Sequence, residues 1–289
     1  QGLKQAGPRF EMYVMVGAWV GCENARTDLP PNHDGENAEA NAAEIQRAID
    51  MANQYPDIVK IIAVGNEAMV KWAASYFVQP GVILKYVNQL QELKKAGKLP
   101  KDLWITSSDN FASWGGGDAE YHVEDLTKLI KAVDYISMHT YRDYAIAQYQ
   151  SVVKYMKSLG IEKPVHIGET GWAGSSDGLY GPDGSKACDE YKEGLYYNMM
   201  REWTNQEGIA CFYFEAFDEI WKDAGNPAGS ENHFGLFTLD GQAKYAIWHL
   251  VDKGVFKGLT RDGNAIGKTY NGDEQALLKE VMLPPFNIK

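Results

Sequence analysis

The stretch that decides the fold is Ile61-Ile62-Ala63-Val64-Gly65-Asn66-Glu67. It is a continuous apolar run that ends in a glycine, an amide and a carboxylate. A strand exposed on one face would alternate polar and apolar residues, so the continuous run predicts a strand buried on both faces. Such strands are typical of parallel α/β sheets, in which ligands bind at the carboxyl ends of the strands. Glu67 is therefore predicted to lie at a ligand-binding edge.

A second stretch has the same composition. Pro164-Val165-His166-Ile167-Gly168-Glu169 rises through apolar residues to a glycine and a glutamate, and Thr170-Gly171-Trp172 follows. The two glutamates are 102 residues apart, since 169 − 67 = 102. Three strand–helix units of about 34 residues each would account for that separation. We therefore expect Glu67 and Glu169 to face one pocket.

The rest of the chain repeats the order strand, loop, helix. Further strands are predicted at 11–19, 103–108, 135–141 and 209–217, and helices at 38–53, 81–96, 126–133, 145–159, 186–206, 245–253 and 275–281. This alternation predicts parallel strands joined by helical crossovers. A closed barrel of this type needs eight strands, and six are counted. The predicted fold is an α/β (β/α)8 TIM barrel that lacks its first two strands, in a single catalytic domain over residues 1–289.

The missing strands lead to an expectation about the N-terminus. Two strand–helix units correspond to about 50–70 residues. We therefore expect the domain in this chain to be N-terminally incomplete, with the full-length protein carrying that many residues more. An open barrel would otherwise leave two parallel strand edges unpaired, which is unfavourable.

Composition excludes several classes of protein. The chain has 289 residues, of which 45% are hydrophobic, with a mean hydropathy of −0.39. No apolar run approaches the roughly 20 residues of a membrane helix, so no membrane span is expected. The net charge is −11 and the basic residues are scattered, which argues against nucleic acid as a partner. Gln1 to Gly7 lacks the pattern of a signal peptide, which leaves the location open.

Cysteine usage and motifs point to no metal or cofactor. Cys22, Cys188 and Cys211 are an odd number at wide separations, which is neither a disulfide framework nor a zinc pattern. A disulfide between Cys22 and Cys188 stays open on this evidence. No phosphate-binding glycine loop and no metal-spaced cluster is present, so we expect neither a cofactor nor a metal site.

Two carboxyl groups at equivalent strand ends suit glycosidic bond cleavage. That reaction needs one carboxyl to protonate the leaving oxygen and a second, ionised one to attack or to activate water. A single glutamate at a strand end more often caps a helix or pairs with a cation, but a matched pair favours the glycosidase hypothesis. The chain also has 8 Trp and 17 Tyr, whose flat faces can bind sugar rings.

Four motifs resemble those of glycoside hydrolase family 17, the β-1,3-glucanases of the (β/α)8 clan. Val64-Gly65-Asn66-Glu67 and Gly168-Glu169-Thr170-Gly171-Trp172 resemble that family's acid and nucleophile strands. The strand with Tyr141 resembles its sixth strand and the segment 214–222 its eighth, and the resemblance spans about Phe10 to Trp248.

The resemblance implies roles for four residues. Glu67 would be the general acid/base, Glu169 the nucleophile, Asn66 a hydrogen-bond partner of the sugar 2-hydroxyl, and Tyr141 a contact of the nucleophile. Such pairs act with retention of configuration, which requires carboxyl groups about 5–5.5 Å apart.

Further substrate-binding candidates are aromatic or charged residues near these motifs. Trp172 is predicted to be a sugar platform, with a core tryptophan as the alternative. Contacts to sugar hydroxyls are predicted for Glu215, Asp218, Glu219 and Lys222, with a surface ion-pair cluster as the alternative. Trp19, Trp114 and Trp221 are additional subsite candidates. His139 is predicted to be a hydrogen-bonded strand histidine and not a catalyst.

The resemblance implies a retaining endo-β-1,3-glucan hydrolase of the laminarinase type. Two alternatives stay open: a β-1,3-glucanosyltransferase, in which a sugar hydroxyl intercepts the covalent intermediate, and a non-catalytic carbohydrate-binding barrel. The expected partner is a β-glucan oligosaccharide or polysaccharide, bound by a monomer. The expected location is secreted, periplasmic or cell-surface.

Overall fold

The computed structural model describes residues 11–141, 144–176, 187–281 and 283. The chain divides into two compact units. Unit 1 consists of residues 1–140 and 145–168, and unit 2 of residues 141–144 and 169–289. The division falls inside strand β5 (Val165–Thr170), so Glu169 is the first residue of unit 2 within that strand.

Unit 1 contains parallel strands in chain order. They are β1 (Val14–Ala18), β2 (Val59–Asn66), β3 (Trp104–Asn110) and β4 (Ile136–His139). In the register, Ile62 of β2 pairs with Val16 of β1 on one side and Ile105 of β3 on the other. Four consecutive residues of β2, from Ile62 to Gly65, are buried. The prediction of a strand covered on both faces is thus confirmed.

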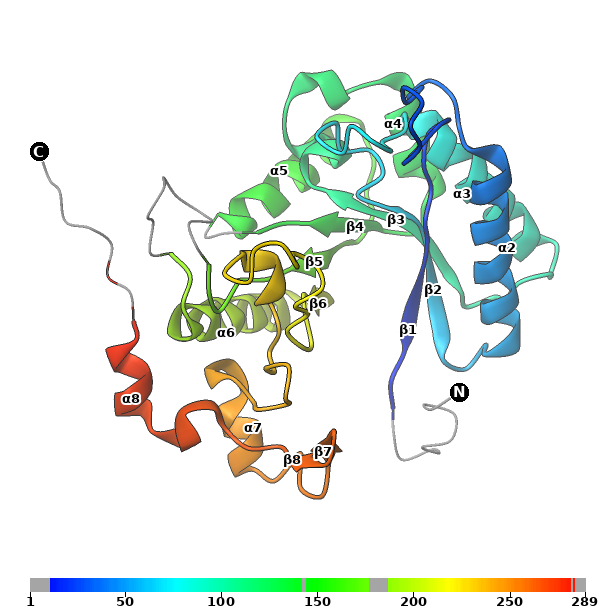
Figure 1. Ribbon diagram of the computed structural model, residues 1–289. Helices are drawn as coiled ribbons and strands as arrows, with labels where there is room; N and C mark the ends of the chain where they lie inside the picture. Colours follow the sequence, from blue (N-terminus) through cyan, green and yellow to red (C-terminus); the bar gives the residue numbers. More distant parts are fainter. Residues whose placement is uncertain (1–10, 142–143, 177–186, 282, 284–289) are drawn as a thin grey trace, which may run out of the picture. The chain divides into compact units, whose positions relative to one another are not determined.

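The helices of unit 1 are the predicted crossovers. They are α2 (Ala38–Gln54), α3 (Pro80–Lys95), α4 (Glu124–Ala132) and α5 (Ala145–Ser158). Helix α2 packs on β1 and β2, and α3 packs on β2 and β3 (Figure 1). Helix α2 buries Ile45, Ala48, Ile49 and Ala52. That spacing of three and four residues places one apolar face against the sheet.

Unit 2 begins with the end of β5 and is mostly helix and loop. Its elements are α6 (Glu190–Glu207), β6 (Cys211–Tyr213), α7 (Trp248–Asp252), β7 (Thr260–Arg261), β8 (Asn264–Ala265) and α8 (Glu274–Lys279). The backbone N–H of Phe214 donates to the carbonyl of Thr170 at 2.7 Å, which ties the chain after β6 to the end of β5. Strands β7 and β8 form a separate antiparallel hairpin.

The six principal strands follow one another in chain order in one sheet, from β1 to β6. Six strands is the number counted from the sequence, and their order is that of consecutive barrel strands. A sheet of this kind places Glu67 directly after β2 and Glu169 at the end of β5. The predicted α/β barrel sheet without its first two strands agrees with this topology.

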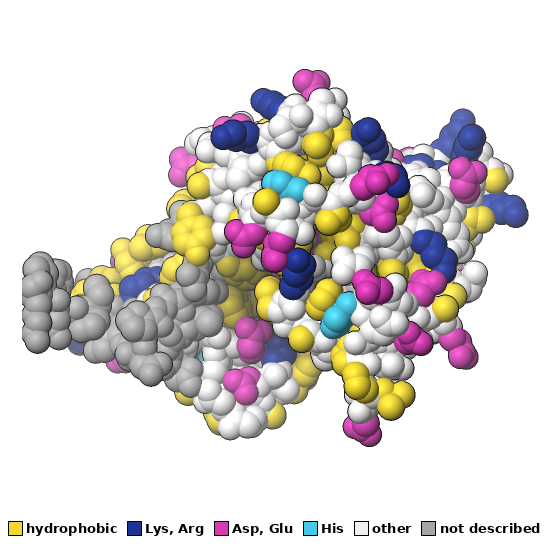
Figure 2. Space-filling view, turned by 90° about the horizontal axis from the view of Figure 1, so that it is seen from above, with side chains coloured by type: hydrophobic (Ala, Val, Ile, Leu, Met, Phe, Trp, Pro, Cys, Tyr) yellow, Lys and Arg dark blue, Asp and Glu magenta, His cyan; other side chains and the backbone are white. Residues whose placement is uncertain are grey.

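Cys22, Cys188 and Cys211 are free thiols, so the disulfide that the sequence left open between the first two is not formed. In the part of the chain that the structure describes, no helix combines the length and the apolar character needed to cross a bilayer. On the face drawn in Figure 2, basic and acidic side chains are intermingled over the described surface. This distribution agrees with the scattered charges of the sequence.

Candidate active site

The turn that carries Glu67 is held by the end of β3. Glu67 has a φ of +46°, a left-handed conformation that non-glycine residues rarely adopt. Its backbone N–H donates to the carbonyl of Ser108 at 2.9 Å, and the N–H of Met69 donates to Oδ2 of Asp109 at 2.8 Å. Two hydrogen bonds from one neighbouring strand therefore fix the backbone on either side of the candidate acid.

The side chain of Glu67 contacts a buried histidine from β4. Oε1 of Glu67 lies 3.1 Å from Nδ1 of His139, whose side chain is fully buried, whereas the Glu67 side chain is 18% exposed. Nε2 of His139 lies 2.8 Å from Oγ of Ser108, and that oxygen lies 3.0 Å from Oγ of Ser137. The sequence predicted a hydrogen-bonded histidine at this position, and the structure adds that one of its partners is the candidate acid.

Asp109 is a buried carboxyl that sequence reasoning did not single out. It is fully buried at the end of β3 and accepts hydrogen bonds from the backbone N–H groups of Met69 and Asn110, both at 2.8 Å. Burial raises its pKa to about 6, although the two amides and the nearby His139 act in the opposite direction. The sequence signal that could have pointed to Asp109 was its position, since it is an acid at the end of the strand next to that of Glu67.

In unit 2, Glu169 is held by a tyrosine. The hydroxyl of Tyr141 donates to Oε1 of Glu169 at 2.6 Å. The Tyr141 ring packs edge-on against Phe234, with ring centres 6.0 Å apart and planes at 76°. The contact between these two side chains is the one that the family resemblance implied.

Trp172 lies three residues after Glu169 and is half-buried. Its Nε1 donates to the carbonyl of Ala187 at 3.1 Å, and its ring lies 5.3 Å from that of Tyr196 on α6. Together with Leu195 and Met199, it lines an open apolar hollow of about 400 Å³. A fixed indole beside an open apolar surface is compatible with the predicted sugar platform.

Three of the predicted hydroxyl contacts form one ion-pair cluster. Nζ of Lys222 donates to both carboxyl oxygens of Glu215, at 2.9 and 2.8 Å, and lies 3.2 Å from the carboxylate of Glu219. It also lies 3.9 Å from the centre of the Phe214 ring. Burial raises the pKa of Glu215 to about 7, and Lys222 acts against that rise. Trp221 beside this cluster is 69% exposed.

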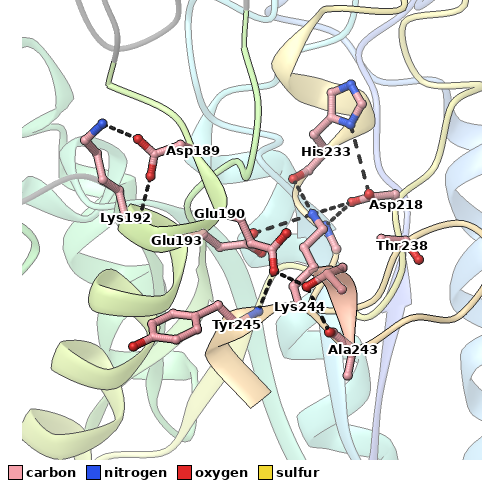
Figure 3. Close-up of polar contacts among 12 residues, drawn as sticks. Asp189, Glu190, Lys192, Glu193, Asp218, His233, Thr238, Ala243, Lys244 and Tyr245 are labelled. Atoms are coloured by element: carbon pink, nitrogen blue, oxygen red, sulfur yellow. Dashed lines mark hydrogen bonds and ion pairs between the residues drawn. The ribbon is translucent and has the colours of Figure 1, made fainter. Parts of the chain in front are cut away.

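Asp218 belongs to a buried network and is not presented to solvent. It is 8% exposed, and its Oδ1 accepts from Nζ of Lys244 at 2.8 Å and from the N–H of Gly235 at 2.9 Å (Figure 3). Lys244, which is 5% exposed, also lies 3.5 Å from the fully buried carboxyl of Glu193 on α6. Burial raises the pKa of Glu193 well above its ordinary value. These contacts favour a supporting role for Asp218.

The network holds the chain that follows Trp172. The carbonyl of His233 accepts from Nζ of Lys244 at 3.1 Å and from the N–H of Gly174 at 2.9 Å. A Cβ at Gly174 would lie 2.5 Å from Oε2 of Glu193 and 3.0 Å from Nζ of Lys244. Only a glycine lets the backbone pass this close to the buried charges.

The remaining predicted residues are in unit 1. Asn66 is exposed as the last residue of β2, directly before Glu67. Trp19 lies 5.7 Å from the Tyr76 ring, and the guanidinium of Arg26 lies 5.0 Å from the Trp19 ring. Trp114 is fully buried and its Nε1 donates to the carbonyl of Ser137 at 3.0 Å. The prediction of Trp114 as a sugar subsite is therefore wrong, because the indole is part of the core.

These features define a carbohydrate-active enzyme of the (β/α)8-barrel class: a parallel sheet whose strands end in carboxyl groups, each held by hydrogen bonds, with aromatic rings beside them. Residues 6–235 match the family model of the BtgE/BtgC glycoside hydrolase domain, and the chain belongs to this family. The barrel class expected from the sequence and the assignment to the glycoside hydrolases are thereby confirmed.

Three proteins with an assigned activity are similar to this chain. A crystal structure of an endo-laminarinase from Formosa Hel1_33_131 is 62% identical, has a TM-score of 0.94, and is matched over 98% of this chain and 81% of that chain. A glucan 1,3-beta-glucosidase from Arthroderma benhamiae is 28% identical over 80% of this chain and 70% of its own length. A family 17 β-1,3-glucanosyltransferase from Rhizomucor miehei, 22% identical with a TM-score of 0.51 over 71% of each chain, shares the fold.

Proposed function

We propose that this protein is a retaining endo-β-1,3-glucan hydrolase that cleaves laminarin-type chains through a covalent glycosyl-enzyme intermediate. The observation that carries the proposal is the likeness to the Formosa endo-laminarinase, at 62% identity over 98% of this chain. The held carboxyl groups of Glu67 and Glu169 supply the chemistry that such a reaction requires.

In the proposed mechanism, Glu169 is the nucleophile. Its carboxylate attacks the anomeric carbon while the bond to the leaving sugar oxygen breaks, which leaves a glycosyl ester on Glu169. The Tyr141 hydroxyl donates a 2.6 Å hydrogen bond to Oε1 of this carboxyl group. It also fixes the orientation of the carboxylate for attack.

Glu67 is the general acid/base. It donates a proton to the departing oxygen in the first step and then removes a proton from the water that hydrolyses the ester. Asn66, exposed beside it, is the proposed partner of the sugar 2-hydroxyl. Trp172, Trp19 and Trp221 are proposed platforms for neighbouring sugars, and the cluster of Glu215, Glu219 and Lys222 is proposed to bind hydroxyl groups.

The test uses laminari-oligosaccharides with Glu67→Gln and Glu169→Gln. Each variant should lose at least about 100-fold in kcat/KM, because general acid/base catalysis alone contributes about 10²–10⁴-fold. The control is Glu92→Gln, which changes an exposed glutamate on α3. Unchanged turnover in either active-site variant would remove that residue from the mechanism, and a parent protein that binds the oligosaccharides without cleaving them would favour a binding protein.

Product analysis tests the stereochemistry and the type of transfer. NMR spectra of the first product should show the β-anomer, as retention requires. An initial α-anomer would contradict the nucleophile assignment. Products shorter than the substrate indicate hydrolysis, whereas products longer than the substrate would indicate a glucanosyltransferase.

We also propose a secreted, periplasmic or cell-surface location and a monomeric enzyme. The support for the location is that a polysaccharide substrate cannot cross a membrane before it is cleaved. Detection of the protein in the culture supernatant or the surface fraction tests the location, and light scattering tests the oligomeric state. A purely cytoplasmic protein or a stable dimer would contradict these two inferences.

A further inference from the structure

His139 joins the candidate acid to two buried hydroxyl groups. Nδ1 faces Oε1 of Glu67 at 3.1 Å, and Nε2 faces Oγ of Ser108 at 2.8 Å. Ser108, Ser137 and His139 are 2%, 0% and 0% exposed. Water therefore does not compete for the hydrogen bonds among these three side chains, which are stronger in such surroundings than at the surface.

Ser108 fixes Glu67 in two ways. Its carbonyl accepts the backbone N–H of Glu67 at 2.9 Å, and its hydroxyl bonds the imidazole that contacts the Glu67 carboxyl. A histidine needed only for packing could satisfy its ring nitrogens with any nearby groups. Here a single residue holds both the backbone of Glu67 and the ring against which its side chain rests.

The hydrogen-bond directions follow from the donors available. When the Ser108 hydroxyl donates to Nε2, the neutral imidazole carries its proton on Nδ1 and donates it to Oε1 of Glu67. Ser137 then donates to the Ser108 oxygen. With Oε1 occupied as an acceptor, the proton that Glu67 carries as an acid lies on Oε2.

We propose that His139 is a positioning residue that holds Oε1 of Glu67 as an acceptor and thereby keeps the acid proton on Oε2, with Ser108 fixing the imidazole. This inference rests on the proposed function, since it presumes that Glu67 is the general acid. The role is separate from the catalytic ones, because His139 acts through Glu67 and not on the substrate.

Two substrates separate this role from simple structural support. Cleavage of laminari-oligosaccharides needs a proton on the leaving oxygen, whereas cleavage of dinitrophenyl β-laminaribioside does not, because dinitrophenolate leaves unprotonated. kcat/KM of a retaining enzyme reports only the steps through formation of the glycosyl ester. A defect in proton donation therefore lowers kcat/KM for the first substrate and spares it for the second.

His139→Leu removes the donor and should lower kcat/KM on the oligosaccharide about 10- to 100-fold, as expected for loss of a hydrogen bond to a carboxyl group that becomes charged as it gives up its proton. On the aryl substrate the loss should be much smaller. His139→Asn is the matched variant, because its amide N–H can replace Nδ1–H as a donor to Glu67, and it should recover part of the lost activity. Equal losses on both substrates, without recovery by Asn, would overturn the inference.

Glu67→Gln serves as the reference and separates the two hypotheses. If it loses activity on both substrates alike, the assignment of Glu67 as the acid fails. If Glu67→Gln loses more activity on the oligosaccharide than on the aryl substrate and His139→Leu does not, only the proposed role of His139 is refuted. Ser108→Ala keeps the backbone hydrogen bond to Glu67 and should also lose more activity on the oligosaccharide than on the aryl substrate, by a smaller factor. This variant tests the role of His139 if His139→Leu does not fold.

Discussion

The hydroxyl of Tyr141 donates a 2.6 Å hydrogen bond to Oε1 of Glu169, so the candidate nucleophile is oriented by a residue that lies 28 positions earlier in the chain. Hydrogen bonds to charged groups stabilise the charged form by about 1.5–3 kcal/mol. This bond fixes the orientation of the Glu169 carboxyl group.

Tyr141→Phe should slow the enzyme without disturbing the packing against Phe234. Loss of the hydrogen bond is expected to lower kcat/KM about 10- to 100-fold, since each 1.36 kcal/mol corresponds to a factor of ten. Initial rates on laminari-oligosaccharides measure the effect. The control is Tyr13→Phe, which removes an exposed hydroxyl from the chain before β1. A Tyr141→Phe enzyme as active as the control would show that the bond does not assist attack.

Asp109→Asn should change how stability depends on pH. The buried carboxyl has a pKa of about 6, above its ordinary value of 3.8. Its stabilising contribution is therefore complete below pH 3.8 and is lost as the pH rises through 6. Between pH 4 and 7 the parent should lose up to about 3 kcal/mol relative to Asp109→Asn, which has no proton to lose there. Urea unfolding of both proteins across this pH range tests the prediction. The same change of unfolding free energy with pH in both proteins would refute it.

Lys244→Met should destabilise the protein strongly. The substitution leaves Asp218 and Glu193 buried without their cation, and breaking a buried ion pair costs about 3–5 kcal/mol. Chemical denaturation measures the loss, and Lys253→Met, at an exposed lysine, is the control. Adding Asp218→Asn to Lys244→Met should recover part of the stability, because the charge of Asp218 is then no longer buried without its cation. A loss below about 1 kcal/mol would mean that the network is not important for folding.

Lys222→Met should weaken binding of the glucan. Without the ammonium, the pKa of Glu215 is expected to rise above about 7, because Lys222 opposes the effect of burial. Near neutral pH, Glu215 would then lose its charge and part of its capacity to accept hydrogen bonds from sugar hydroxyls. KM for laminari-oligosaccharides should increase more than kcat decreases. An unchanged KM would support the alternative, in which the cluster is only an ion pair.

The sequence was informative where the signal was local. The continuous apolar runs before Glu67 and Glu169 correspond to β2 and β5, and the helical spacing of residues 38–53 corresponds to α2. These patterns arise because a strand between two others is buried on both faces and a helix on one face. Strand order also followed, since each crossover places the next parallel strand beside the last.

Trp114 shows where a local signal fails. It stands before Gly115, Gly116 and Gly117, a composition typical of an exposed loop. In the structure, residues Ala112–Gly116 form a π-helical turn, and Gly115 has a φ of +86°. A Cβ at Gly115 would lie 2.0 Å from the Tyr155 ring. The glycine allows a close approach to α5 that buries the indole, which depends on contacts distant in sequence.

The short hairpin of β7 and β8 was also absent from the sequence-based expectations. Asp262 and Gly263 have φ values of +50° and +84°, and such a pair favours the tight turn of a two-residue hairpin. Its strands have only two residues each, too few to show a period of two. The Asp-Gly pair was therefore the only local signal available there.

The hydrogen bonds that hold Glu67 could not be predicted from the sequence for another reason. Ser108, Asp109 and His139 come from two strands and act through single hydrogen bonds that depend on register. Nothing in the separate stretches indicates that the hydroxyl of one serine meets the ring of a histidine 31 positions later. Polar residues at strand ends are common, and only the folded sheet decides which of them meet.

Ser108 holds both the backbone of Glu67 and the ring that contacts its carboxyl group, and this has a consequence for protein engineering. The acid cannot be transplanted as a short peptide motif, because its left-handed backbone is bonded to β3 and its carboxyl to a ring on β4. A designer who moves Glu67 into another scaffold has to import the ends of three adjacent strands in register.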